Sequence, residues 1–407
     1  MDILKTTKTL DRYSGKLIET KVLTDGSYVY MQREDSKSKI LIERDLELYR
    51  LLMRDNGNLS QGRINHLVIE PVYECNLNCP ICFTYGQKGQ ISLEEVRKEI
   101  SKYRNKIVSI SGGEPTLYKD LVEIIKIVAG RNIPLLATNG LKLVDFDYLM
   151  RLKKAGLRHV TFSLNGFSDN TFIKTNGQIF LEEKMKAIEN LLKADMKFLL
   201  SMLLVRGVNE EEIKSIVDFA AKHSKNIKEV RIRSVSPIGK YTSQQEPFFA
   251  SEILELFCNS VGVRKEEVYQ ELLFKKILLK KIPYFAYLQK TCSFSFYLEV
   301  KENAYIPLGK YLNFSPEYYF HFIRKIWQYG GTRFLYKKFQ EWLFGKSLYI
   351  WHHGDQFLKI SIRSWPSIKT LDFQDHVKLC NSRYIRGRKE NLPVCYANIL
   401  CDIGAIK

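Results

Sequence analysis

Three cysteines stand close together in the segment ECNLNCPICF, with the spacing C-x3-C-x2-C that joins Cys75, Cys79 and Cys82. Thiolates at this density on one loop can converge on one metal centre, and cysteine thiolates hold iron–sulfur clusters. A structural zinc site is the alternative, but it commonly uses four ligands, and no neighbouring Cys or His supplies a fourth. Three ligands leave one iron of a four-iron cluster open to a reactive group. The spacing therefore predicts a catalytic [4Fe–4S] centre.

Short turn motifs recur further along the chain. They are Ser111-Gly112-Gly113-Glu114-Pro115-Thr116, Thr138-Asn139-Gly140, Ser163-Leu164-Asn165-Gly166 and Val205-Arg206-Gly207. Each alone is an ordinary turn, since Gly and Asn close many strands without any function. Glycine also lets the backbone approach a ligand closely, and Glu114 offers an acceptor for an ammonium group. Only their common position in the predicted fold, at the ends of strands, indicates a functional site.

The elements that must position these motifs begin at residue 66, where short apolar strands alternate with helical stretches. The strands read HLVIEPVYE, KIVSISG, IPLLAT, RHVTFSLN, KFLLSMLLV and IKEVRIRSV. Five helical stretches separate these six strands between residues 66 and 235. Parallel strands need such crossovers, so an α/β fold is predicted, either a partial (β/α)6 barrel or a doubly wound sheet. The cysteines and turn motifs all follow strands, at the edge where such folds carry their sites.

This pattern resembles the radical SAM superfamily, in which C-x3-C-x2-C is followed by an aromatic residue, here Phe83, and then by GGEP and SLNG motifs. The resemblance implies a partial (β/α)6 barrel that binds a [4Fe–4S] cluster and S-adenosylmethionine (SAM). Reductive cleavage of SAM would yield a 5′-deoxyadenosyl radical that abstracts hydrogen from an unactivated carbon. It also implies a reductant such as flavodoxin or ferredoxin.

The same resemblance assigns cofactor contacts. Gly112, Gly113 and Glu114 would receive the SAM amino group, Ser163 and Asn165 the ribose or carboxylate, and Val205 the adenine. Phe83 and Asn139 complete the predicted set of cofactor-binding residues.

Four further cysteines lie in the C-terminal half: Cys292, Cys380, Cys395 and Cys401. They could ligate an auxiliary iron–sulfur cluster, or they could be buried thiols, as free cysteines often are. This tail resembles the SPASM/twitch radical SAM enzymes, and more closely those related to tetraether lipid synthases. Cys258, within SEILELFC, is predicted to be a core helix residue.

Residues 315–365 combine all four tryptophans with many basic residues. This composition favours an amphipathic helical pair that lies on a membrane surface, or a lid that packs its aromatic face on the barrel. His352 and His353 are adjacent, so a strand would point them in opposite directions, and we expect no metal site there.

Composition bounds the remaining expectations. The chain has 407 residues and a formal charge of +18, without a signal peptide or a long apolar run. We therefore expect a cytoplasmic protein, with peripheral membrane association through residues 315–365. Nucleic acid is disfavoured as a partner because the basic residues are dispersed. Three regions are expected: a hairpin and short helix (1–65), the radical SAM barrel (66–235), and a C-terminal α+β accessory or lid domain (236–407).

The predicted function is hydrogen abstraction from a hydrophobic or lipid-like substrate with an anionic head. The alternative enzyme is a SPASM/twitch-type maturase of a ribosomally made peptide. A non-catalytic iron–sulfur protein would not need the GGEP and SLNG motifs.

Overall fold

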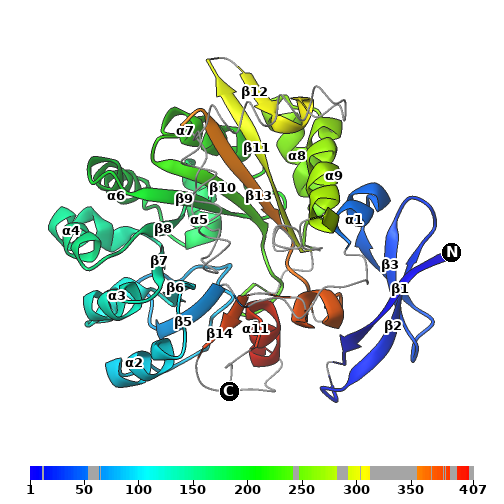
Figure 1. Cartoon of the computed structure of the whole chain (residues 1–407), viewed down its shortest axis with the longest axis horizontal. Coiled ribbons are helices and arrows are strands. Elements are labelled where there is room, and N and C mark those ends of the chain that lie inside the picture. Colours follow the sequence, from blue (N-terminus) through cyan, green and yellow to red (C-terminus); the bar gives the residue numbers. More distant parts are fainter. Residues whose placement is uncertain are drawn as a thin grey trace.

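The computed structural model of the chain (Figure 1) describes residues 1–11, 13–53, 64, 66–241, 247–281, 292–302, 304–311, 355–367, 369–378, 380, 382–385 and 392–402. The predicted tryptophans at 327, 342 and 351 and the pair His352-His353 lie outside these residues.

The predicted N-terminal hairpin is present as part of a four-stranded antiparallel sheet. Its strands are β1 (Asp2–Leu10), β2 (Leu17–Thr24), β3 (Val29–Arg33) and β4 (Lys39–Glu43), followed by helix α1 (Leu46–Leu52). The turn at Asp25-Gly26 joins β2 to β3. Strand β1 was not predicted, because its sequence is rich in lysine and threonine and shows no alternation of apolar and polar residues. One face of the strand is buried in the folded sheet, where β1 pairs with β2.

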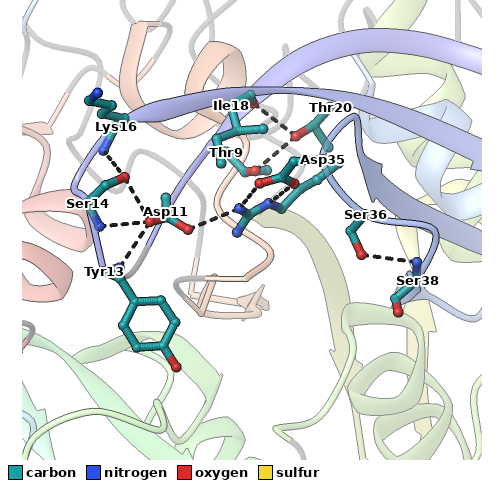
Figure 2. Close-up of polar contacts among 11 residues, drawn as sticks. Thr9, Asp11, Tyr13, Ser14, Lys16, Ile18, Thr20, Asp35, Ser36 and Ser38 are labelled. Atoms are coloured by element: carbon teal, nitrogen blue, oxygen red, sulfur yellow. Dashed lines mark hydrogen bonds and ion pairs between the residues drawn. The ribbon is translucent and has the colours of Figure 1, made fainter.

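Polar side chains fix the turns of this small sheet (Figure 2). Asp11 accepts hydrogen bonds from the backbone N–H of Tyr13 at 3.2 Å and of Ser14 at 2.7 Å, as an Asx turn does. Its other oxygen lies 3.0 Å from Arg33, which also pairs with Asp35 at 2.5 Å. Three segments of the sheet are therefore held at one end by carboxylates.

The central sheet contains the six predicted parallel strands, and this prediction is confirmed. They are β5 (His66–Val72), β6 (Ile107–Gly112), β7 (Ile133–Thr138), β8 (His159–Ser163), β9 (Lys197–Leu204) and β10 (Ile227–Ser234), paired in this order.

The crossover helices cover one face of this sheet. They are α2 (Leu93–Ser101), α3 (Leu121–Ala129), α4 (Phe146–Lys154), α6 (Leu181–Lys193) and α7 (Glu212–Lys222), all predicted. Short 3-10 turns follow β6 (Pro115–Leu117) and β7 (Leu141–Val144). Helix α5 (Asp169–Asn176) was not predicted, because its polar sequence DNTFIKTN carries little apolar periodicity. The apolar faces of these helices and the sheet share one core.

The C-terminal half extends this sheet instead of forming a separate layer (Figure 1). Strand β13 (Phe357–Arg363) pairs in parallel with β10, and β14 (Ser382–Tyr384) pairs in parallel with β5. Beyond β13 lie the antiparallel strands β11 (Ser293–Lys301) and β12 (Ala304–Pro307). The C-terminal α+β region is therefore present, but it completes the barrel sheet at both edges. Local sequence patterns could not show this pairing between distant segments.

Four further elements surround these strands. They are helices α8 (Ala250–Val261), α9 (Lys265–Lys281) and α11 (Val394–Asp402), and the short 3-10 turn Leu308–Tyr311. Another helical turn spans Phe373–Lys378. Helix α8 ends at Gly262, which has a φ of +72°, and α9 begins three residues later. Cys258 is buried in α8, as predicted.

No helix among the described residues is long and apolar enough to cross a membrane.

The N-terminal sheet is attached to α8 and α9 by buried polar groups. Ser251 donates a hydrogen bond to Oε1 of Glu43, and the Arg44 N–H donates to the same atom at 2.7 Å. Asp45 accepts from Tyr269 at 2.6 Å and from Lys265 at 3.1 Å. Burial raises the pKa of Glu43 to about 7, although these hydrogen bonds oppose the rise.

This shift predicts a stability that depends on pH. Because the folded state raises the pKa of Glu43 from 4.5 to about 7, it binds the proton more tightly than the unfolded chain. Stability is then highest below pH 4.5 and falls as pH rises towards 7, by about 3 kcal/mol in all. Glu43→Gln keeps the Oε1 acceptor and removes the charge. We expect nearly equal unfolding free energies at pH 4 and a variant about 3 kcal/mol more stable at pH 8, measured by urea unfolding.

Glu19→Gln is the matched control, because the Glu19 side chain is 50% exposed in the same sheet. Its unfolding free energy should stay within about 0.5 kcal/mol of wild type at both values of pH. Equal pH dependence in Glu43→Gln and wild type would contradict the assignment.

Candidate active site

The cysteine loop follows β5 and is joined by backbone hydrogen bonds to the GGEP segment after β6. The Gly113 N–H donates to the Val72 carbonyl at 3.0 Å, and the Glu114 N–H donates to the Glu74 carbonyl at 2.7 Å. A Cβ atom on Gly113 would lie 2.3 Å from the carbonyl oxygens of both Tyr73 and Glu74. Glycine is therefore required for the two segments to lie this close.

Each predicted cluster thiol receives a polar contact from the chain. The Leu77 N–H donates to the Cys75 sulfur at 3.4 Å, and the Asn176 amide lies 4.0 Å from the Cys79 sulfur. The Thr84 hydroxyl lies 3.5 Å from the Cys82 sulfur. Hydrogen bonds of this kind orient thiolate ligands and tune a cluster. The donor set thus fits an iron–sulfur cluster with three cysteine ligands.

Burial raises the pKa of Cys79 to about 11, and the neighbouring thiols of Cys75 and Cys82 add to the rise. The pKa of Cys75 is raised in the same way, first by burial and then by nearby Glu114 and Cys82. The thiols of Cys75 and Cys79 therefore lie near the other cysteines of the loop. Within the described residues, no three Cys, His, Asp or Glu side chains are placed to hold one metal ion. Ligands of a four-iron cluster each bind a different iron, so they need not meet at one point.

Glu114 is buried, with 1% exposure, and its carboxylate holds the ends of two strands. Oε1 accepts from the hydroxyls of Thr116 and Thr138, both at 2.7 Å. Oε2 accepts from the Asn139 N–H at 2.8 Å. A carboxylate oxygen has two lone pairs, so Oε2 retains one for the ammonium group predicted from sequence. That contact remains a prediction.

Lys184 brings a buried cation to the same place. This residue of α6 is 1% exposed, and its ammonium donates to the carbonyls of Asn139 at 3.0 Å and Ser163 at 2.6 Å. Burial lowers the pKa of Lys184 to about 8, while Cys79 and Glu114 oppose the fall. The sequence analysis missed Lys184. Its signal was a lysine in register with the apolar stripe of α6, formed by Ala187, Ile188 and Leu191.

The other predicted SAM contacts lie at neighbouring strand ends. Asn139 also bonds Asn76 in the cysteine loop at 2.8 Å. The Asn165 side chain accepts from the Leu203 N–H at 2.9 Å, which leaves its amide N–H groups for other partners. Val205 packs with Ile81 of the cysteine loop and with Val235. These residues surround one edge of the sheet, as predicted, while their individual SAM contacts remain predictions.

The C-terminal half reaches this edge as well. The Phe83 and Trp365 rings lie 5.7 Å apart, and Trp365 is 8% exposed. The Lys240 N–H, in the segment after β10, donates to the Cys82 carbonyl at 2.8 Å. Trp365 belongs to the aromatic segment for which membrane docking and a lid were the two predicted alternatives, and its packing on the cysteine loop is what the lid alternative expects of this residue. The rest of that segment up to residue 354 lies outside the described residues.

The strand register separates two of the four C-terminal cysteines. Cys292 precedes Ser293, which pairs with Arg363 at the carboxyl end of β13. Cys380 precedes Ser382, which pairs with His66 at the amino end of β5. Cys395 and Cys401 lie together on α11. The register therefore places Cys292 and Cys380 near opposite ends of the parallel strands, and the auxiliary-cluster ligand set remains a prediction.

Comparison with known proteins agrees with this geometry. Residues 69–220 match the Radical SAM superfamily. The 7,8-dihydro-6-hydroxymethylpterin dimethyltransferase of Methanocaldococcus jannaschii is 35% identical over 184 residues, which cover 42% of this chain and 36% of that protein. A probable GTP 3′,8-cyclase of Pyrococcus abyssi is 35% identical over 166 residues, covering 39% and 54%. The chain thus spans between about a third and a half of the length of these relatives.

The crystal structure of Streptococcus suis SuiB bound to S-adenosylmethionine aligns with a TM-score of 0.43 at 15% identity, covering 63% of this chain and 68% of SuiB.

A parallel α/β sheet with three cysteines after its first strand defines the class as a cluster-binding partial barrel. Residues 69–220 belong to the radical SAM superfamily. This family uses a [4Fe–4S] cluster and SAM.

The close approach at Gly113 predicts a specific defect. Gly113→Ala forces the cysteine loop away from the GGEP segment, because the new Cβ would overlap two carbonyl oxygens at 2.3 Å. Overlap of this kind typically costs about 1–3 kcal/mol. We expect the variant to retain much less iron and sulfide than wild type after anaerobic reconstitution.

Gly130→Ala is the control, since its Cβ would meet the nearest atom at an ordinary 3.5 Å. It should keep the wild-type iron content. Full iron and sulfide in Gly113→Ala would show that the loop does not depend on this contact.

Proposed function

We propose that the protein is a radical SAM enzyme that abstracts hydrogen from an unactivated carbon of a substrate with an anionic group. The observation that carries the proposal is the hydrogen-bonded junction of the cysteine loop and the GGEP segment, where Gly113 and Glu114 bond the residues just before Cys75. The bound cluster and SAM supply a radical that removes a hydrogen atom. An electron donor such as flavodoxin or ferredoxin is required.

The residues of the chain would then have separate tasks. Cys75, Cys79 and Cys82 would hold the cluster, while Glu114 would accept from the SAM ammonium and keep two strand ends together. Trp365 and the segment after β10 cover the cysteine loop. Such cover excludes water and oxidants, which a radical reaction needs.

The substrate proposal keeps the anionic head that the sequence suggested. The prediction that the substrate is hydrophobic depended on residues 315–365, and the structure describes only 355–365 of these. On β10 and β13 the inner face carries four cations and one carboxylate, and this favours an anionic group. The peptide-maturase alternative has no described feature in its favour. Membrane docking remains a prediction for residues 315–354.

The function is tested by SAM cleavage. Cys79→Ala removes one of three cluster ligands, so we expect 5′-deoxyadenosine formation to fall to background after reduction with dithionite. Cys258→Ala is the matched control, because Cys258 is a buried thiol in α8, away from the strand ends. It should keep its activity. A wild-type protein that binds iron yet never cleaves SAM would refute the proposal.

A triple variant with alanine at 75, 79 and 82 tests the auxiliary cluster. A second four-iron cluster would leave about four irons per chain. We expect this iron to remain in the folded variant, bound by Cys292, Cys380, Cys395 and Cys401. Iron near zero would leave these four residues as structural thiols.

A further inference from the structure

Two arginines lie side by side near the carboxyl ends of β10 and β13. Arg233 and Arg363 are direct partners in the register of these parallel strands. The residues that alternate with them are fully buried in the core, against helices α7 and α8. They are Val230, Ile232, Ile360 and Ile362. Since successive side chains of a strand point to opposite faces, the two arginines share the other, inner face.

The charges on this inner face do not balance. Glu229 is buried and pairs with Arg231 at 2.9 Å and with Lys359 at 3.1 Å. On the described strands β10 and β13 this is one carboxylate among four cations on that face. Arg231 lies two residues before Arg233, and Glu229 and Lys359 lie four residues before Arg233 and Arg363, so both ion pairs are further from the carboxyl edge of the sheet. The two outer arginines therefore extend beyond the carboxylate that neutralises the inner ones.

Neither outer arginine has a hydrogen bond or ion pair from its side chain within the described part of the chain. The Nε atoms of both are inaccessible to solvent and have no partner. Burial lowers the pKa of Arg233 to about 9, and the charges of Arg231 and Arg363 add to the fall. Both side chains are partly buried, and an anion at this place would offset the cost of removing their charges from water.

These strands lead directly to the predicted SAM site. Two residues after Arg363, Trp365 packs against Phe83 of the cysteine loop. After Arg233, the chain reaches Lys240, which bonds the Cys82 carbonyl. A molecule held by both arginines would thus lie at the same edge of the sheet as the cysteine loop.

We propose that Arg233 and Arg363 form a binding site for an oxyanion, a carboxylate or a phosphate of the substrate. Guanidinium groups match both oxyanions through paired N–H donors. The neighbouring row adds hydroxyls on the same face, since Ser201 and Ser361 both pair with Arg231. The inference rests on the proposed function and specifies which part of the substrate this site recognises.

The test is thermal unfolding of the reconstituted protein in inorganic phosphate, acetate or chloride at matched ionic strength. Phosphate or acetate should raise the midpoint above its value in chloride, because a ligand of the folded state stabilises it. The anion with the larger effect identifies the kind of oxyanion. In the double variant Arg233→Met, Arg363→Met the affinity should fall by about 100-fold or more, as expected for two charge-assisted hydrogen bonds.

Arg264→Met is the control, because the Arg264 side chain is 74% exposed. It should respond to phosphate and acetate as wild type does. Arg233→Met should also unfold in chloride at a temperature no lower than wild type, since it removes a partly buried charge that has no ion pair among the described residues. A purely structural arginine would give a lower temperature.

The inference is overturned if the wild type responds to neither anion, or if the double variant responds as the wild type does. Formation of 5′-deoxyadenosine by the wild type is measured separately. SAM cleavage without oxyanion binding would remove this inference alone. Oxyanion binding without SAM cleavage would support the site and remove only the proposed enzymatic function.

Discussion

Two buried charges, the Glu114 carboxylate and the Lys184 ammonium, hold the ends of three strands together. Asn139 is fixed from both sides, because its N–H donates to Glu114 and its carbonyl accepts from Lys184. Lys184 also binds the Ser163 carbonyl, and Glu114 binds Thr138. Hydrogen bonds to buried charges are strong, and loss of either partner leaves the other uncompensated. The geometry of the cysteine loop depends on this arrangement, since the Glu114 backbone bonds the residue before Cys75.

The second constraint is that the region that covers the site belongs to the same sheet as the region that forms it. Strand β13 brings Trp365 to Phe83. Helix α11 brings the Asp402 carboxylate to the Gly239 N–H, at 2.9 Å, in the segment that bonds the cysteine loop. The strand that carries Trp365 and the strands that carry the candidate site therefore belong to one hydrogen-bonded sheet.

Local sequence patterns predicted the features that depend on local order. The six strands, their five main crossover helices and the cysteine loop all followed from periodicity and spacing. Lys184 did not, because a lysine in an amphipathic helix is usually at the surface, and only its register with Ala187 and Ile188 marked it. The pairing of Arg233 with Arg363 and the separation of Cys292 from Cys380 require the register between distant strands, which no local pattern contains.

The pairing of β14 with β5 has a consequence for the synthesis of the chain. The side chains of His66 and Ser382 are in hydrogen-bond contact although 316 positions separate them in the sequence. Strand β10 likewise pairs with β13, which is synthesised much later. Until these late segments leave the ribosome, both outer strands of the first six present unpaired backbone N–H and C=O groups, which are templates for association with other chains. The last eighth of the sequence therefore covers both outer strands, and a chain that stops before residue 357 would leave β5 and β10 without these partners.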